Sequence, residues 1–259
     1  MDDGLSTWTT VREKDVVVLS APKNCHLIKA GDGRKRISQI GVFNTSSLVG
    51  REYGDTQRLG PNIFTILKPT LPLLHRAFRR KAQVITLKDA ITIVGELGIR
   101  SGSNVLEVGV GSGFMTAVLL WFIGSGGELI SYERRKDFAE IAEENIRSAA
   151  LDGNWSLKVS PGEEIDEKDR FDCAVVDVPE PWSLMENVGN ALLRGGKAAF
   201  YMPTYNQFET CLRAFGDAGL SKTGAREVLV RDMTTTEGSI RPCFDMLGHT
   251  GFLLFARKR

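Results

Sequence analysis

The segment best suited to bind a small-molecule ligand is rich in glycine and contains an acid, Glu107, just before its glycines. Residues 105–116 read VLEVGVGSGFMT. Gly109, Gly111 and Gly113 let the backbone turn sharply and approach a ligand with no Cβ in the way. A following helix would offer unpaired N–H groups to a carboxylate or phosphate. A dinucleotide-binding fingerprint, G-x-G-x-x-G, would need glycine where this chain has Phe114. The spacing therefore disfavours a nicotinamide or flavin dinucleotide.

Two acids stand where further strands are expected to end. Glu133 closes the strand expected over residues 127–133, where a carboxylate can accept hydrogen bonds from both hydroxyls of a ribose. The alternative is a surface glutamate beside Arg134 and Arg135. Asp177 lies within residues 175–182, VVDVPEPW, where two prolines stiffen the loop. An acid and an aromatic ring held there can orient a nucleobase. The alternative is a helix-capping aspartate.

An alternation of helices and apolar strands must position these residues. We expect strands over residues 104–110, 127–133, 171–178, 197–203, 225–233 and 250–258. We expect helices over residues 89–97, 114–123, 137–150, 183–193 and 207–218, with Ala90, Ile91, Val94 and Leu97 facing inward in the first. Such alternation predicts an α/β fold with a mostly parallel sheet. The last two strands have no helix between them, so one runs antiparallel. The glycine segment and both acids then lie at strand ends, where such sheets bind ligands.

Short β-type runs precede this region. Residues 16–20, 26–30 and 36–43 read as strands, and Gly31-Asp32-Gly33 between two of them reads as a hairpin turn. Residues 61–72 read as a connector. We therefore expect a small all-β domain with its connector over residues 1–72 and a larger α/β domain over residues 73–259.

The overall composition excludes several classes of protein. The chain has 259 residues and a formal net charge of +1, so contact with nucleic acid must come from local basic clusters. Three such clusters lie near residues 34–36, 76–81 and 257–259. Four cysteines without CxxC spacing and three histidines leave no zinc ligand set, and we expect no metal. The start is polar, and the longest apolar run, residues 117–123, is too short to span a membrane. We expect a cytoplasmic protein.

Five segments, taken in order, resemble the TrmI family of tRNA (adenine-N1)-methyltransferases. They are QVITLKD at 83–89, VLEVGVGSGFMT at 105–116, SYERR at 131–135, VVDVPEPW at 175–182 and GHTGFL at 248–253. The resemblance implies a class I methyltransferase fold and S-adenosylmethionine as cofactor. It implies that Asp177 is the catalytic residue. The residues it implies at the cofactor are Glu107, Gly109, Gly111, Ser112, Gly113, Phe114, Glu133, Glu163 and Asp177.

The substrate side departs from the family pattern at two places. The family commonly has an aromatic residue and proline where this chain has Thr86-Leu87. Its third motif often has aspartate after glycine, whereas Gly162 is followed here by Glu163. Residues expected to contact the substrate are Gln83, Thr86, Trp182 and His249, although a tryptophan packed in the core and a structural histidine are the competing interpretations of the last two.

The resemblance implies methyl transfer to N1 of adenosine 58, or of 57 and 58, in the T-loop of tRNA by a homotetramer. Asp177 would accept a hydrogen bond from the exocyclic amino group of the adenine, which must leave its stack to expose N1. Two alternatives stay open. The chain could methylate a protein or small molecule, or it could be a non-catalytic RNA-binding subunit of a methyltransferase complex.

Overall fold

The structure, a computed structural model, describes residues 9–37, 41–81, 83–216 and 218–259. The chain forms two compact units. The first contains the residues up to Arg80 together with 143–152, and the second contains 81–142 and 153–259. The expected domain boundary between residues 72 and 73 stays a prediction.

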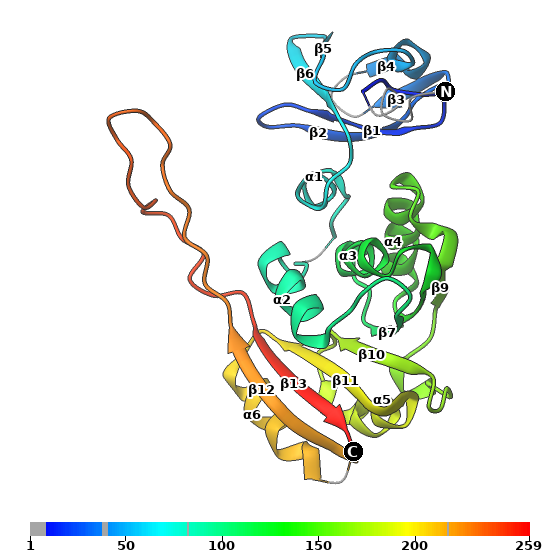
Figure 1. Ribbon diagram of the computed structural model, residues 1–259, viewed down its shortest axis with the longest axis vertical. Helices are drawn as coiled ribbons and strands as arrows, with labels where there is room; N and C mark the ends of the chain where they lie inside the picture. The colour runs from blue at the N-terminus through cyan, green and yellow to red at the C-terminus, as the bar shows by residue number, and fades with distance from the viewer. Residues whose placement is uncertain (1–8, 38–40, 82, 217) are drawn as a thin grey trace, which may run out of the picture. The chain divides into compact units, whose positions relative to one another are not determined.

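The first unit is built on antiparallel strands (Figure 1). One sheet has the order β2-β1-β6-β5, and β3 pairs with β4 in a separate ribbon. The elements are β1 (Val16–Ser20), β2 (Cys25–Lys29), β3 (Arg34–Ile37), β4 (Gly41–Asn44), the 3-10 turn η2 (Thr45–Leu48), β5 (Thr56–Leu59), β6 (Asn62–Leu67) and α1 (Leu71–Ala77). Val17, Leu19, Phe64 and Ile66 are fully buried because every second residue of β1 and β6 faces one core.

Three expectations for this unit were wrong. The single strand expected over residues 36–43 is split between β3 and β4, and residues 38–40 lie outside the described residues. Gly31 and Gly33 have positive φ, but the turn they make joins strands of different sheets, so it is not a hairpin. The connector expected over residues 61–72 contains β6, whose alternating burial makes it part of the core.

The second unit has a seven-stranded sheet with the order β12-β13-β11-β10-β7-β8-β9 (Figure 1). Its strands are β7 (Asn104–Val108), β8 (Glu128–Tyr132), β9 (Trp155–Lys158), β10 (Phe171–Val176), β11 (Leu192–Met202), β12 (Leu220–Glu227) and β13 (Phe252–Lys258). β13 runs antiparallel to both of its neighbours, and β7 to β11 are parallel. The expected mostly parallel sheet with an antiparallel last strand is therefore confirmed.

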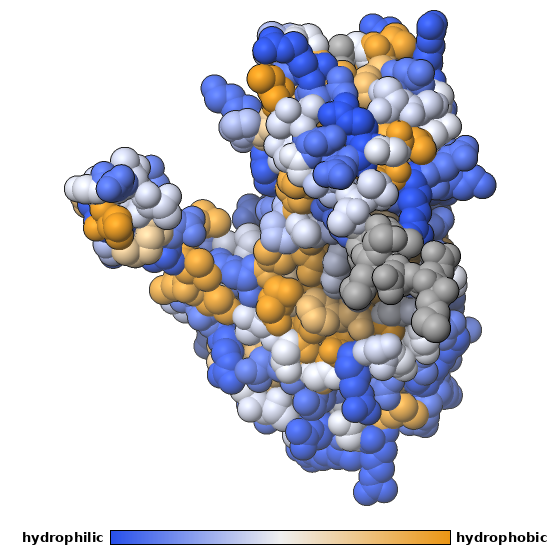
Figure 2. Space-filling view, turned by 45° about the horizontal axis from the view of Figure 1, so that its top comes forward, coloured by the Kyte–Doolittle hydropathy of each residue, from blue (hydrophilic) through white to orange (hydrophobic). Residues whose placement is uncertain are grey.

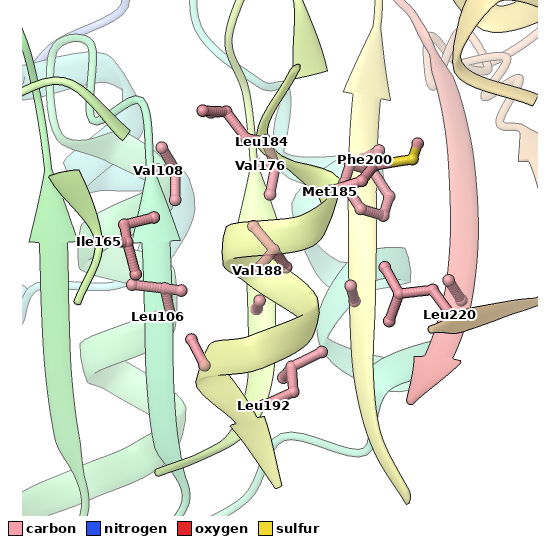
Figure 3. Close-up of a cluster of buried hydrophobic side chains, with 14 of the residues drawn as sticks. Leu106, Val108, Ile165, Val176, Leu184, Met185, Val188, Leu192, Phe200 and Leu220 are labelled. Carbon is pink, nitrogen blue, oxygen red and sulfur yellow. The ribbon is translucent and has the colours of Figure 1, made fainter. Parts of the chain in front are cut away.

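Helices cover both faces of this sheet. The helices of this unit are α2 (Leu87–Leu97), α3 (Phe114–Ile123), α5 (Met185–Ala191), α6 (Tyr205–Arg213) and the first part of α4 (Lys136–Ser148), which continues into the first unit from residue 143. The 3-10 turns are η3 (Gly124–Gly126), η4 (Asp152–Asn154), η5 (Gly162–Glu164), η6 (Pro181–Leu184) and η7 (Ala214–Gly216). α2 and α3 contact one face. Leu106, Val176 and Phe200 point to the other face, where they pack with Val188 of α5 (Figure 3). Because both faces are buried, most side chains of the central strands are apolar, and Glu107 and Ser131 are buried polar exceptions.

The carboxyl-terminal part of the second unit departs from the expected elements. The helix expected over residues 183–193 ends at Ala191, and the strand expected from residue 197 begins at Leu192. The helix expected over residues 207–218 is α6, which ends at Arg213 before the turn η7. The strand expected over residues 225–233 is β12, which lies five residues earlier. β12 is an edge strand with one neighbour, so its sequence, LSKTGARE, is largely polar.

β9 was missed because only four residues form it at the other edge. In α2, Ile93 is buried and Ile91 is exposed, the reverse of the expectation for Ile91.

Residues 228–251, between β12 and β13, form an extended arm (Figure 1). The arm folds back on itself through an isolated antiparallel bridge between Met233 and Pro242. Main-chain hydrogen bonds from Thr234 to Arg241 and from Cys243 to Asp232, both 2.8 Å, hold the two sides together.

Candidate active site

A cavity of about 250 Å³ lies at the carboxyl ends of β7, β8 and β10. It is lined by Val108, Gly109, Tyr132, Glu133, Arg134, Arg135, Gly162, Glu163, Asp177, Val178, Pro179, Glu180, Ser183 and Leu184. Four of the predicted site residues, Gly109, Glu133, Glu163 and Asp177, therefore share one cavity. This is the edge of a parallel sheet where ligands are expected.

The glycine segment makes a tight turn over this edge. Gly109, Gly111 and Gly113 have φ of +88°, +56° and +82°, which residues with a Cβ rarely adopt. A Cβ on Gly109 would lie 2.0 Å from the carbonyl oxygen of Asp177. Gly109 is thus required by the close passage of the loop that carries Asp177, and Asp177 N–H in turn donates to the Val108 carbonyl at 2.8 Å.

Glu133 ties the second strand to this turn. Its Oε2 accepts the main-chain N–H groups of Val110 at 3.2 Å and Gly111 at 3.1 Å. Its Oε1 accepts from the main-chain N–H and the Nε of Arg135, at 3.0 and 3.2 Å. The side chain is almost fully buried yet lines the cavity, so one carboxylate both holds the turn and faces a ligand.

Asp177 lines the same cavity as Arg134 and Arg135 of the turn after β8. It is half-buried, and burial together with the nearby Glu133 carboxylate raises its pKa to about 7, against the opposing effect of Arg135. Its loop is held by Gln207, whose Nε2 donates to the Pro179 carbonyl at 2.9 Å. The contact therefore holds the main chain of the loop that carries this carboxylate.

Glu107 lies beneath the turn and does not line the cavity. Its carboxylate accepts hydrogen bonds from the hydroxyls of Thr116, at 3.0 and 2.8 Å, and Ser131, at 2.6 Å. Burial raises its pKa to about 7, and the hydroxyl hydrogen bonds oppose that rise. In this structure Glu107 links β7, β8 and α3, which places the turn.

Gly162, in the segment that matches the family's third motif, is needed because there is no room for a side chain at this position. A Cβ on Gly162 would lie 2.7 Å from Leu184 and 2.8 Å from Val108 side-chain atoms. Glu163 follows at the cavity with an exposed side chain, and its carbonyl accepts from Asn187 Nδ2 at 3.2 Å.

The remaining predicted site residues lie outside the cavity lining. Ser112 and Phe114 are buried at the start of α3, and Ser112 Oγ accepts from the Lys81 N–H at 3.2 Å. Trp182 is half-buried in η6, and Gln83 is exposed. His249 bonds Glu227 and the Pro203 carbonyl, both at 2.7 Å, which explains its raised pKa.

Thr86 belongs to a buried polar cluster that the sequence did not indicate. Its hydroxyl donates to Asp89 at 2.8 Å, and Thr250 Oγ1 donates to the same carboxylate at 2.7 Å. Lys88 Nζ reaches both Asp89 and Thr250, at 2.9 and 2.6 Å. Asp89 has no exposed surface. The polar Thr86, which stands where the family commonly has an aromatic residue, therefore has polar partners inside the fold. The helical spacing of residues 89–97 gave no sign of this cluster.

Arg135 and Tyr132 are cavity residues that were missed. Both lie within two residues of Glu133 in SYERR, and closeness to a strand-end acid was the available signal. Within the ranges that the structure describes, no group of three His, Cys, Asp or Glu side chains could hold a metal ion. Every helix in those ranges is too short or too polar to cross a bilayer.

Comparisons with known proteins identify relatives of this chain. The sequence profile of the family described as tRNA methyltransferase complex GCD14 subunit matches residues 62–241. The chain is 29% identical over 221 residues to tRNA (adenine(57)-N(1)/adenine(58)-N(1))-methyltransferase TrmI of Methanocaldococcus jannaschii, covering 75% of this chain and 78% of that relative. It is 31% identical over 197 residues to tRNA (adenine(58)-N(1))-methyltransferase TrmI of Thermus thermophilus, covering 75% and 76%.

Two solved structures resemble the whole chain. A SAM-dependent O-methyltransferase from Thermotoga maritima superposes with a TM-score of 0.80 at 28% identity, covering 100% of this chain and 97% of that one. The tRNA (m1A58) methyltransferase TrmI from Aquifex aeolicus superposes with a TM-score of 0.75 at 27% identity, covering 96% and 99%.

Proposed function

The chain belongs to the family described as the tRNA methyltransferase complex GCD14 subunit, and from this premise we propose that it transfers a methyl group from S-adenosylmethionine to N1 of adenosine 58 in the tRNA T-loop. The expected resemblance to the TrmI family is confirmed. The observation that carries the proposal is the single cavity in which the strand-end acids Glu133 and Asp177 meet the glycine turn.

The residues present fit S-adenosylmethionine by their chemistry. Glu133 offers a buried carboxylate at the end of β8 to the ribose hydroxyls. Gly109 and Gly162 allow the close packing of the segments that form the cavity wall, and Val178 and Leu184 offer apolar surface to a flat ring. When bound, the cofactor supplies an electrophilic methyl group on a positively charged sulfur. We assign Glu107, Gly111, Ser112, Gly113 and Phe114 to shaping the turn that holds it.

Asp177 is the residue we assign to the substrate. Adenine N1 carries an in-plane lone pair, so alignment of N1 with the methyl group is the main catalytic task. The Asp177 carboxylate would accept a hydrogen bond from the exocyclic amino group and stabilise the positive charge that develops on the ring. The prolines that follow, with the Gln207 contact, restrain the main chain of the loop that carries this carboxylate.

The target must leave its stack to reach this cavity, and we propose that Trp182 and the Gln83 to Thr86 segment border its path. Trp182 is half-buried in η6 and keeps part of its ring accessible. His249 packs against Phe252 with ring centroids 4.7 Å apart, which supports a structural role for it at the base of the arm. Methylation of adenosine 57 as well is compatible with this site, since one relative is named for both positions.

We further propose that the chain works as a homotetramer in the cytoplasm. The support is the arm, on which Leu229, Val230, Met233, Ile240, Phe244, Met246 and Leu247 are exposed. Figure 2 shows hydrophobic residues along it. Exposed apolar side chains gathered in one segment are typical of an association surface. Sedimentation of a Phe244→Ser, Leu247→Ser double variant tests this, because loss of those side chains should yield smaller species.

Labelled cofactor distinguishes the proposal from its alternatives. Incubation with methyl-labelled S-adenosylmethionine and either bulk tRNA or protein should place label in tRNA alone. Label in protein would favour a protein methyltransferase, and label in neither tRNA nor protein would favour a small-molecule substrate. Failure to bind S-adenosylmethionine in calorimetry would favour a non-catalytic subunit.

A further inference from the structure

A second hollow, of about 660 Å³, lies at the opposite edge of the same sheet. It is formed where the parallel strands begin, by the turn that precedes β7 and by the first residues of β10 and β11. β7 has five residues, so the two edges are roughly 16 Å apart along the strands. This hollow is therefore distinct from the cofactor cavity and has no part in the chemistry described above.

Positive charge dominates the hollow. Arg100, Arg194 and Lys197 line it, and the only acid in the lining, Asp172, uses Oδ2 to accept the Asn104 N–H at 2.8 Å. Arg100 and Arg194 are exposed, and among the described residues neither guanidinium has an ion pair or hydrogen bond. The Lys197 ammonium donates to the Glu96 carbonyl at 3.1 Å, an uncharged partner.

The neighbouring strand adds a fourth cation in an unfavourable position. Arg257 of β13 lies directly opposite Lys197 of β11 in the antiparallel register. Directly opposed residues project from the same face, so two like charges face each other there. Arg257 is exposed and has no ion pair within the described part of the chain. Like charges opposed across a sheet destabilise it, and an anion bound between them would offset that cost.

We propose that Arg100, Arg194, Lys197 and Arg257 form a docking site for the phosphodiester backbone of tRNA, at a part of that molecule remote from the methylated loop. The inference rests on the proposed function for the identity of the RNA. Guanidinium groups match phosphate oxygens in geometry and charge. Gly195, beside Arg194, has no atom within 4 Å of where a Cβ would stand, so a backbone can approach closely. With a net charge of +1, the chain needs such local clusters to attract RNA.

Binding of a tRNA transcript across a range of salt concentrations tests the site directly. For an Arg194→Gln, Arg257→Gln double variant, affinity near 0.1 M salt should fall roughly tenfold, and the slope of log K against log salt should fall by about 1 to 2. The matched control is Arg213→Gln, an exposed arginine of α6 that pairs with Glu209 at 2.6 Å. Equal affinity and slope in the double variant and this control would overturn the proposal.

Kinetics separate this site from the catalytic one. The double variant should raise KM for full-length tRNA while kcat and S-adenosylmethionine affinity stay unchanged. A short stem-loop carrying only the target adenosine should be methylated at the wild-type rate, and slower methylation of it would overturn a remote docking role. If the wild type methylates neither RNA, the proposed function fails, whereas the binding measurement still decides the docking site.

Thermal stability gives a further, independent result. Without RNA, Arg257→Gln should raise Tm by roughly 1–3 °C, because it removes the opposition to Lys197. A fall of several degrees would show that the cations stabilise the fold instead, and would contradict the proposal.

Discussion

Glu133 Oε2 accepts the main-chain N–H of Gly111 at 3.1 Å, so the acid at the end of β8 holds the glycine turn that follows β7. The same carboxylate lines the cavity that we assign to S-adenosylmethionine. The Glu133 side chain therefore both holds the turn and is expected to contact the ribose. Its substitution should lower the affinity for S-adenosylmethionine.

Glu133→Gln should weaken S-adenosylmethionine binding by about 10- to 100-fold, since hydrogen bonds to a charged group contribute about 1.5–3 kcal/mol. An amide keeps the size of the side chain but accepts through only one of its two terminal atoms. Isothermal calorimetry measures the change. The matched control is Glu128→Gln at the other end of β8, where Glu128 pairs with Arg170 at 2.8 Å. Equal affinities for the two variants would contradict the ribose assignment.

Methylation should depend on pH through Asp177. Burial raises the pKa of this carboxyl to about 7, so it is increasingly protonated below neutral pH and loses its ability to accept from the adenine amino group. We expect kcat/KM to rise between pH 6 and 8 and to fall about tenfold per unit well below the pKa. Asp177→Asn should remove this limb. A flat wild-type profile, or the same limb in the variant, would contradict the role of Asp177.

Stability should fall as pH rises through the titration of Glu107. Its pKa is about 7 when folded and near 4.5 in the unfolded chain, so the folded state holds the proton more tightly. The resulting stabilisation is complete below about pH 4.5 and is lost as pH rises through 7, a change of about 3 kcal/mol. Denaturant unfolding of Glu107→Gln between pH 5 and 8 should show a smaller decline than the wild type. The exposed Glu186→Gln should decline as the wild type does, and an unchanged slope in Glu107→Gln would refute this explanation.

Gly109→Ala should disrupt the turn itself. The new Cβ would lie 2.0 Å from the Asp177 carbonyl oxygen, in a residue with φ of +88°. A loss of more than about 3 kcal/mol in unfolding free energy, or failure to fold, is expected. Gly219→Ala is the control, because φ is +65° there but no atom lies within 4 Å, and it should cost only about 1 kcal/mol. Similar losses in both variants would mean that backbone conformation alone explains Gly109.

The sheet and the glycine turn were predictable because local signals agree with the tertiary structure there. α3 has the predicted bounds, Phe114–Ile123, since glycines stand at both ends of a continuous apolar run. β12 was misplaced because residues 228–230 form an apolar run that resembles a strand, yet they belong to the arm. An exposed apolar segment and an apolar segment buried in the fold look alike in sequence.

Which acids reach the cavity could not be settled from strand ends alone. Glu107 and Glu133 both stand near the carboxyl edge, but Glu107 lies within β7 and points to the face covered by α3, where Thr116 and Ser131 bind it. Glu133 comes one residue after β8 and turns toward the cavity. Glu107 is paired with Ser131 in the register of β7 and β8, so Glu133 lies two residues further on and beyond the last paired residue, where strand alternation no longer sets the direction of the side chain.

Mass spectrometry of nuclease fragments from tRNA, before and after incubation with the protein and S-adenosylmethionine, tests the central claim most directly. The wild type should add one methyl group to the fragment containing adenosine 58, at N1. Asp177→Ala should add none while binding S-adenosylmethionine within about threefold of the wild type, and the exposed Asp166→Ala should methylate normally. Near-normal N1 methylation by Asp177→Ala, or no methylation of that fragment by the wild type, would contradict the account.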